Sequence, residues 1–133
     1  MTRWPWLARD VVLAVHDEQL AEHGGRPGIR DAGLLDSALA RPVNRAAYAD
    51  STVFDLAAAY AFGIVRNHPF VDGNKRVAFL AAALFLAEHD REVTASDQAV
   101  VTAVLSLAEG SMDESSFALW LRDNTAMSSD ASS

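Results

Sequence analysis

Apolar residues recur at spacings of three and four along most of the chain, which is the period of an amphipathic or buried helix. Alanine and leucine, which favour helices, outnumber the β-branched residues that favour strands. No segment carries a convincing strand pattern, so we predict no β-sheet. The pattern therefore predicts an all-α fold, a compact helical bundle around a central helical hairpin.

Turn residues divide the first part of this pattern. A helix from about Leu7 to His23 should end at the two glycines that follow it. Asp31 can cap a short helix that stops before Pro42, because proline disfavours the helical conformation of the residue before it. The stretch from Pro42 to Asp50 is then irregular, and it is either a flap over a site or a surface connection.

The central hairpin is predicted from two strongly apolar segments. Thr52 and Asp55 have the spacing of a capping box, and they open a segment that is almost wholly apolar to Val65. A second apolar helix starts after a polar connection, at Gly73-Asn74, and runs to about His89. Helices that are apolar on most sides are buried, so these two should form the core.

Two further helices complete the expected bundle. Ser96 or Asp97 starts the first of them and Gly110 ends it, while Asp113 or Glu114 starts the last. We interpret residues 1 to 127 as one domain and residues 128 to 133, which are rich in serine, as a disordered tail.

Composition limits the number of domains, the kinds of site and the cellular location that we expect. The chain has 133 residues, half of them hydrophobic, which suits one core. It has no cysteine, so disulfides, thiolate metal sites and a cysteine nucleophile are excluded. The first residues lack the features of a secretory signal and no apolar run is long enough to cross a bilayer, so we expect a cytoplasmic protein without a membrane role.

The net charge of -7 is unevenly distributed. Residues 1 to 87 carry nine acidic and nine basic residues, whereas residues 88 to 133 carry nine acidic and two basic ones. An acidic half without a basic stripe argues against direct binding of nucleic acid. The segment from Phe62 to Leu80 is the exception, because three cations face one acid there, and this favours an anionic ligand.

The connection between the two core helices contains the residues of a candidate anion-binding site. Gly73 and Asn74 begin a helix, whose free N–H groups and dipole favour an anion. Lys75, the only lysine of the chain, and Arg76 lie in the first turn, where positive charge is unfavourable unless a negative ligand is near. Arg66 either reaches the same anion or caps the preceding helix.

His68 and Asp72 complete a candidate reaction centre. A histidine can take a proton from a hydroxyl, and a carboxylate beside a phosphate site is a natural Mg²⁺ ligand. Alone, His68 is as well explained as a helix-end histidine and Asp72 as an N-cap, but the cluster favours a site. Phe70 should anchor the loop in the core. The histidines and tryptophans elsewhere are interpreted as surface and packing residues respectively: His16, His23 and His89; Trp4, Trp6 and Trp120.

The run His68-Pro69-Phe70-Val71-Asp72-Gly73-Asn74-Lys75-Arg76 resembles the motif of the Fic family, H-P-F-x-[D/E]-G-N-G-R-x-x-R, and more closely its death-on-curing (Doc) variant. Similarity to Doc-like proteins extends over roughly residues 7 to 124. It implies the Fic fold, with His68 as proton acceptor, Asp72 as Mg²⁺ ligand, and a phosphate cradle made by four residues: Gly73, Asn74, Lys75 and Arg76.

Two departures from the general motif influence the expected reaction. Lys75 replaces a glycine, and Phe79 replaces the final arginine. The Doc-type relatives share both changes, and the resemblance implies that ATP or another nucleoside triphosphate phosphorylates a threonine of elongation factor Tu, which arrests translation. The alternatives are AMP transfer by the same site and a catalytically silent module that binds phosphate or a partner.

An inhibitory helix of the form [S/T]-x-x-x-E-[G/N] restrains some Fic proteins. The nearest run here, Leu105 to Gly110, has leucine where serine or threonine is required. The resemblance therefore implies a toxin that is restrained in trans by a Phd-like antitoxin, whose disordered tail folds on binding.

Overall fold

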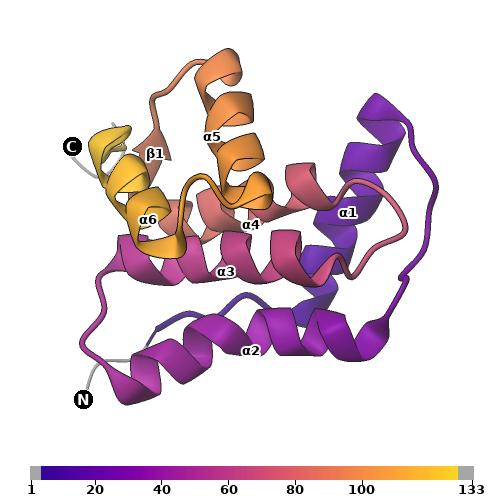
Figure 1. Cartoon of the computed structure of the whole chain (residues 1–133), viewed down its shortest axis with the longest axis horizontal. Coiled ribbons are helices and arrows are strands. Elements are labelled where there is room, and N and C mark those ends of the chain that lie inside the picture. The colour runs from indigo at the N-terminus through magenta and orange to yellow at the C-terminus, as the bar shows by residue number, and fades with distance from the viewer. Residues whose placement is uncertain (1–3, 129–133) are drawn as a thin grey trace.

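A computed structural model of the chain describes residues 4–128 as six helices and one small sheet (Figure 1). The helices are, in chain order, α1 (Arg9–His23), α2 (Ala32–Tyr48), α3 (Val53–Asn67), α4 (Asn74–Ala87), α5 (Asp97–Glu109) and α6 (Glu114–Asp123). This confirms the predicted all-α architecture. The predicted tail lies outside the described residues except for Ser128.

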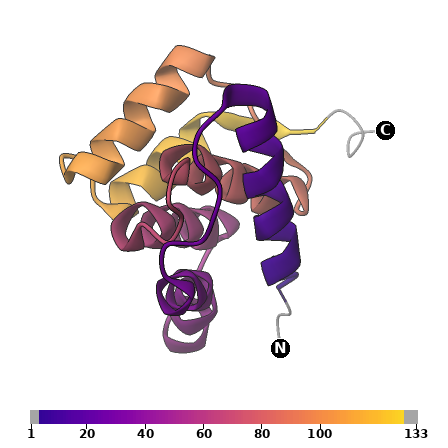
Figure 2. The ribbon, with the colours of Figure 1, turned by 90° about the vertical axis from the view of Figure 1, so that its right-hand side faces the viewer.

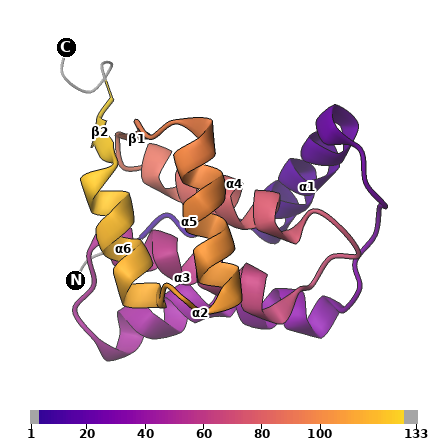
Figure 3. The ribbon, with the colours of Figure 1, turned by 45° about the horizontal axis from the view of Figure 1, so that its top comes forward.

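Helix α3 is the centre of the bundle, because it packs against α2, α4, α5 and α6 (Figure 1). Nine of its fifteen residues are buried, as its apolar composition predicts. The capping box at its start is confirmed: the Thr52 hydroxyl accepts from Asp55 N–H at 3.1 Å, and Asp55 accepts from Thr52 N–H at 2.9 Å. Helices α3 and α4 form the predicted hairpin, and α5 and α6 cross in front of it in Figure 3.

The prediction that a helix stops before Pro42 is wrong, and so is the irregular stretch to Asp50. Helix α2 continues through Pro42 to Tyr48. Proline lacks the N–H that would bond the Ala38 carbonyl, but that carbonyl lies against Gly63 of α3, where an added Cβ would approach it to 3.0 Å. Burial of Leu35, Ala38 and Pro42 on one face against α3 offsets the lost hydrogen bond.

The prediction of no β-sheet is wrong in one respect, because the structure contains a short two-stranded sheet. Strand β1 (Arg91–Val93) pairs with β2 (Thr125–Met127) in antiparallel register, with Glu92 opposite Ala126. Strands of three residues are too short for an alternating pattern to be detected. The sheet joins the end of α4 to the end of α6. Other boundaries differ from prediction by two residues, which is the usual fraying of helix ends.

Two loops meet at one end of the hairpin. Figure 2 shows this end facing the viewer, with the connection between α1 and α2 beside the connection between α3 and α4. Backbone bonds hold them together: Arg30 N–H donates to the Pro69 carbonyl at 2.7 Å, and Val71 N–H donates to the Gly28 carbonyl at 3.0 Å. The loop with the candidate chemistry is thus supported by chain that lies about forty residues earlier.

Candidate functional site

The loop between α3 and α4 is held in one conformation by its own residues. His68 ends α3 in the left-handed conformation, with φ 52° and ψ 54°, and its N–H donates to the Ile64 carbonyl. Phe70 is fully buried, which confirms its predicted role as the anchor. Gly73, with φ 80°, is the N-cap of α4. The prediction that the second core helix starts at Gly73-Asn74 is therefore confirmed, and His68 is the C-cap of α3.

Asn74 is the buried organiser of this loop, with only 3% of its surface exposed. Its Oδ1 accepts from Phe70 N–H at 2.9 Å, and its Nδ2 donates to the Phe70 carbonyl at 2.9 Å. These two bonds fix the orientation of the amide, so its second N–H points to His68 Nδ1, 3.1 Å away. A neutral imidazole that accepts a hydrogen bond at Nδ1 carries its own hydrogen on Nε2.

The N-terminus of α4 offers unpaired N–H groups, because no side chain caps this helix. Lys75 and Arg76 lie in its first turn, are exposed, and have no ion pair within the described residues. The helix dipole and two free cations thus add to one another at a single point. An anion is the ligand that relieves this accumulation of positive charge.

Asp72 lies beside that point with its carboxylate exposed. Its oxygens accept from the N–H groups of Arg26, at 3.2 Å, and Gly73, at 2.9 Å. These two hydrogen bonds, together with the positive charges of Arg26 and Arg76, lower the pKa of Asp72 below its usual value. The carboxylate is therefore ionised at neutral pH and able to hold a cation.

A cavity of about 1000 Å³ contains these groups. Its polar wall includes the predicted site residues His68, Asp72, Gly73, Asn74, Lys75 and Arg76. Its apolar wall is formed by α4, α5 and β1, with Phe79, Leu80, Val100, Val101, Val104 and Leu105 among its residues. The loop between α3 and α4 and the N-terminus of α4 therefore line one cavity, which can accept a ligand with an anionic and an apolar part.

The structure does not bring Arg66 to this cavity. Its side chain is exposed on α3, and the guanidinium carbon lies 5.6 Å from the centre of the Phe62 ring. Residues on the lining of the cavity belong to the loop, to α1, α4 and α5, and to the chain around β1.

Sequence reasoning missed four residues that build the site. His16, predicted to be on the surface, is 3% exposed; its Nε2 lies 2.9 Å from the Asp72 carbonyl and its ring stacks on Phe70 at 3.9 Å. Gln19 is 2% exposed and lines the cavity. The signal was present, because Val12, His16 and Gln19 share one face of α1 at spacings of four and three.

The other two missed residues are arginines of the connection between α1 and α2. Arg30 donates from Nε to the His68 carbonyl at 2.7 Å and from a terminal nitrogen to the Asn67 carbonyl at 2.8 Å, so it caps the end of α3. Arg26 supplies its N–H and its charge to Asp72. No sequence pattern foretold these contacts, since they depend on how the two loops meet. His23 is exposed as predicted, while His89 is half-buried and its Nδ1 lies 2.9 Å from the Phe85 carbonyl.

The described residues contain no group of three or more histidine, cysteine or acidic side chains that would cage a metal ion. Within the same residues, 4–128, no helix is both long and apolar enough to cross a bilayer.

Comparison with known proteins is consistent with this geometry. A family model described as the Fic/DOC family matches residues 6–86. The chain is 32% identical over 117 residues to protein kinase doc of Escherichia phage P1, and the aligned region covers 87% of this chain and 92% of that protein. It is 48% identical over 65 residues to toxin Doc of Mycolicibacterium smegmatis, and this aligned region covers 47% of this chain and 50% of that protein.

Proposed function

Since the chain belongs to the Fic/DOC family, we propose that it is a toxin of the Doc type, a protein kinase that moves the terminal phosphoryl group of a nucleoside triphosphate to a protein hydroxyl. The proposed acceptor is a threonine of elongation factor Tu, whose modification arrests translation. The observation that carries the proposal is the uncapped α4 N-terminus, with two unpaired cations in its first turn, beside an ionised carboxylate.

The phosphates are bound by the start of α4. The Gly73 N–H is already bonded to the Asp72 carboxylate, so the backbone N–H groups that would donate to the anion are those of Asn74 and the residues after it, while Lys75 and Arg76 neutralise its charge. Phosphoryl transfer requires little covalent chemistry from the protein, because positioning and charge stabilisation supply most of the acceleration. A preorganised helix start with two cations meets that requirement.

Asp72 fits the Mg²⁺ that accompanies a nucleoside triphosphate. Its lowered pKa keeps it charged, its carboxylate is exposed to the cavity, and one carboxylate together with substrate phosphates is the usual protein contribution to Mg²⁺ binding. When bound, Mg²⁺ neutralises charge that develops on the transferred group.

His68 is the proposed proton acceptor for the attacking hydroxyl, at Nε2. In the resting geometry Asn74 donates to Nδ1, so the hydrogen of the neutral ring is on Nε2. Action as a base requires the other tautomer, which has its hydrogen on Nδ1, and the Asn74 contact must be released for it to form. Binding of the nucleotide next to Asn74 is the step that we expect to release it.

The proposed partner is a Phd-like antitoxin that restrains the toxin in trans. Leu80, Val101 and Leu105 are exposed on the apolar wall of the cavity, next to the phosphate site. An antitoxin segment with an apolar helical face would cover these side chains and block access to the cations. Replacement of Val101 by aspartate should weaken such binding and leave the helical fold intact.

The function is tested by incubation of the protein with ATP, Mg²⁺ and elongation factor Tu, followed by intact mass of the target. A gain of one phosphate on a threonine is expected, and His68→Ala should abolish it. A gain of AMP would instead identify the site as an AMP transferase. If the target stays unmodified while nucleotide still binds, the chain is a binding module without catalysis.

A further inference from the structure

Gln19 is a buried amide without a hydrogen-bond partner. It lies on α1 and is 2% exposed, and within the described residues neither its Nε2 nor its Oε1 is hydrogen-bonded. A buried polar group that lacks a partner costs free energy, and such groups are rare in folded proteins. An apolar side chain of the same size would avoid this cost, so packing does not explain the presence of glutamine.

The neighbour of Gln19 on the same face of α1 shows what a structural contact looks like there. His16, one turn earlier, is equally buried, but its Nε2 bonds to the Asp72 carbonyl and its ring stacks on Phe70. His16 thus supports the loop through both its Nε2 atom and its ring face. Gln19 faces the same loop and has no comparable contact.

The amide of Gln19 lies directly against Gly73, the N-cap of α4. A Cβ added at Gly73 would overlap the Gln19 Nε2 atom, so the amide can lie this close to the start of α4 only because Gly73 has no side chain. Gln19 also lines the cavity together with Asp72 and Lys75. The terminal torsion of glutamine is soft, so the amide can turn toward a ligand without movement of α1.

We propose that Gln19 is a phosphate-binding residue, which donates an N–H from Nε2 to a phosphate oxygen held at the first turn of α4. This inference rests on the proposed function, because it assumes that the anion bound there is the phosphate chain of a nucleotide. It adds a direct ligand contact from α1 to a phosphate site whose other proposed ligand contacts come from the start of α4. Ligand binding thereby pairs the one buried amide that the free protein leaves unsatisfied on this helix.

Replacement of Gln19 by methionine tests the proposal, because methionine has a similar shape and no amide. With Mg²⁺ and tripolyphosphate as the probe, Gln19→Met should raise the Kd about tenfold, which corresponds to the loss of one hydrogen bond to a charged group. The Tm should stay the same or rise, because a buried unpaired amide has been removed. Gln98→Met is the matched control, since Gln98, the other glutamine of the chain, is exposed on α5 outside the cavity.

A second measurement needs no variant. In the full-length protein, the side-chain NH₂ signals of Gln19 should shift in ¹⁵N NMR spectra when Mg²⁺ and tripolyphosphate are added, and those of Gln98 should not. An unchanged Kd in Gln19→Met, or a Gln19 signal that does not move while Lys75 and Arg76 signals do, would overturn the role of Gln19 and leave the proposed function standing. If the wild-type protein binds no tripolyphosphate, both the role and the proposed function fail.

Discussion

The side-chain amide of Asn74 lies 3.1 Å from His68 Nδ1, and its orientation is fixed by two bonds to the backbone of Phe70. The residue that starts α4 therefore also decides which nitrogen of the histidine carries the hydrogen. This couples the phosphate site to the proposed base, because a ligand that binds the N–H groups at the start of α4 lies next to Asn74.

The first prediction concerns the tautomer of His68. In the free protein, the ¹⁵N shifts of the neutral ring should report hydrogen on Nε2, and Asn74→Ala should remove this preference. With Mg²⁺ and a non-hydrolysable ATP analogue, the shifts should move toward the form with hydrogen on Nδ1. A ring that stays in the first tautomer when nucleotide is bound would contradict the assignment of His68 as the base.

A second prediction follows from the lowered pKa of Asp72. Since its carboxylate accepts two N–H bonds, its contribution to stability is present above the pKa of an unfolded aspartate and is lost as the pH falls through the lowered pKa in the folded chain. Unfolding by urea should show wild type more stable than Asp72→Asn at about pH 6, with the difference shrinking toward about pH 3. A difference that is independent of pH would show that the carboxylate charge is not involved. The same variant should lose the response of phosphate transfer to Mg²⁺.

The third prediction isolates the contact between Gly73 and Gln19. Gly73→Ala combines left-handed strain with overlap on the Gln19 amide, whereas Gly110→Ala, at φ 88° with no neighbour within 4 Å, has the strain alone. Left-handed alanine costs about 1–2 kcal/mol, so Gly110→Ala should lose about that much and Gly73→Ala more. Equal losses in denaturant unfolding would mean that the overlap is relieved without cost.

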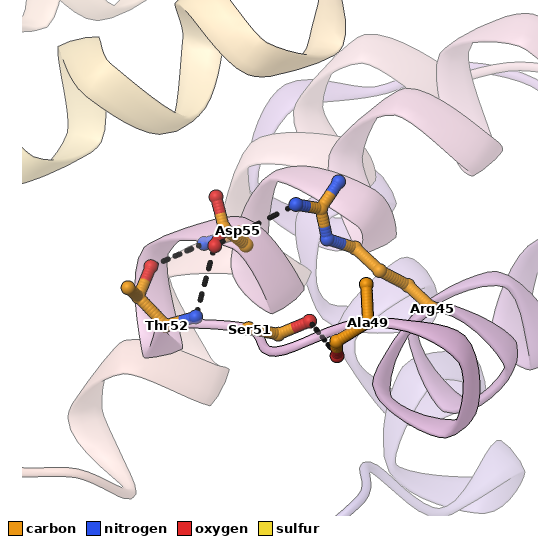
Figure 4. Close-up of polar contacts among 5 residues, drawn as sticks. All are labelled: Arg45, Ala49, Ser51, Thr52 and Asp55. Carbon is orange, nitrogen blue, oxygen red and sulfur yellow. Dashed lines mark hydrogen bonds and ion pairs between the residues drawn. The ribbon is translucent and has the colours of Figure 1, made fainter.

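The fourth prediction is purely structural and concerns the far end of α3. Figure 4 shows the capping box of Thr52 and Asp55, with Arg45 reaching Asp55 at 3.6 Å. Thr52→Ala should lower the free energy of unfolding by about 1 kcal/mol, and Thr52→Ser, which keeps the hydroxyl, should lower it much less. Since His68 lies at the C-terminal end of α3, away from Thr52, phosphate transfer per folded molecule should be unchanged in both variants. Equal stability of the two variants would contradict the role of the hydroxyl.

The sequence allowed prediction of features that depend on local chemistry. The capping box, Gly110 at the end of α5, the burial of Phe70 and the link between α3 and α4 follow from residues close together in the chain. The anion site itself stays a prediction, and the structure brings its predicted residues to one cavity, except Arg66 of α3.

Features that depend on packing between distant segments were not predictable in this way. Pro42 remains helical because α2 buries its apolar face on α3, and turn chemistry alone does not reveal that burial. His16 and Gln19 are buried only because α1 lies under the loop, and Arg26 and Arg30 reach the loop only because two connections meet. The two strands have three residues each, which is too short for an alternating pattern of apolar and polar residues to be recognised in the sequence.

The loop from His68 to Arg76 is proposed to transfer the terminal phosphate of a nucleotide to a protein. This proposal is tested most directly by parallel reactions of elongation factor Tu with Mg²⁺ and ATP labelled at either the γ or the α phosphate. For a kinase, the target should take up label from the γ position only, and His68→Ala should transfer none. Label taken up from the α position would contradict the proposal and show that the same loop transfers the nucleotide instead.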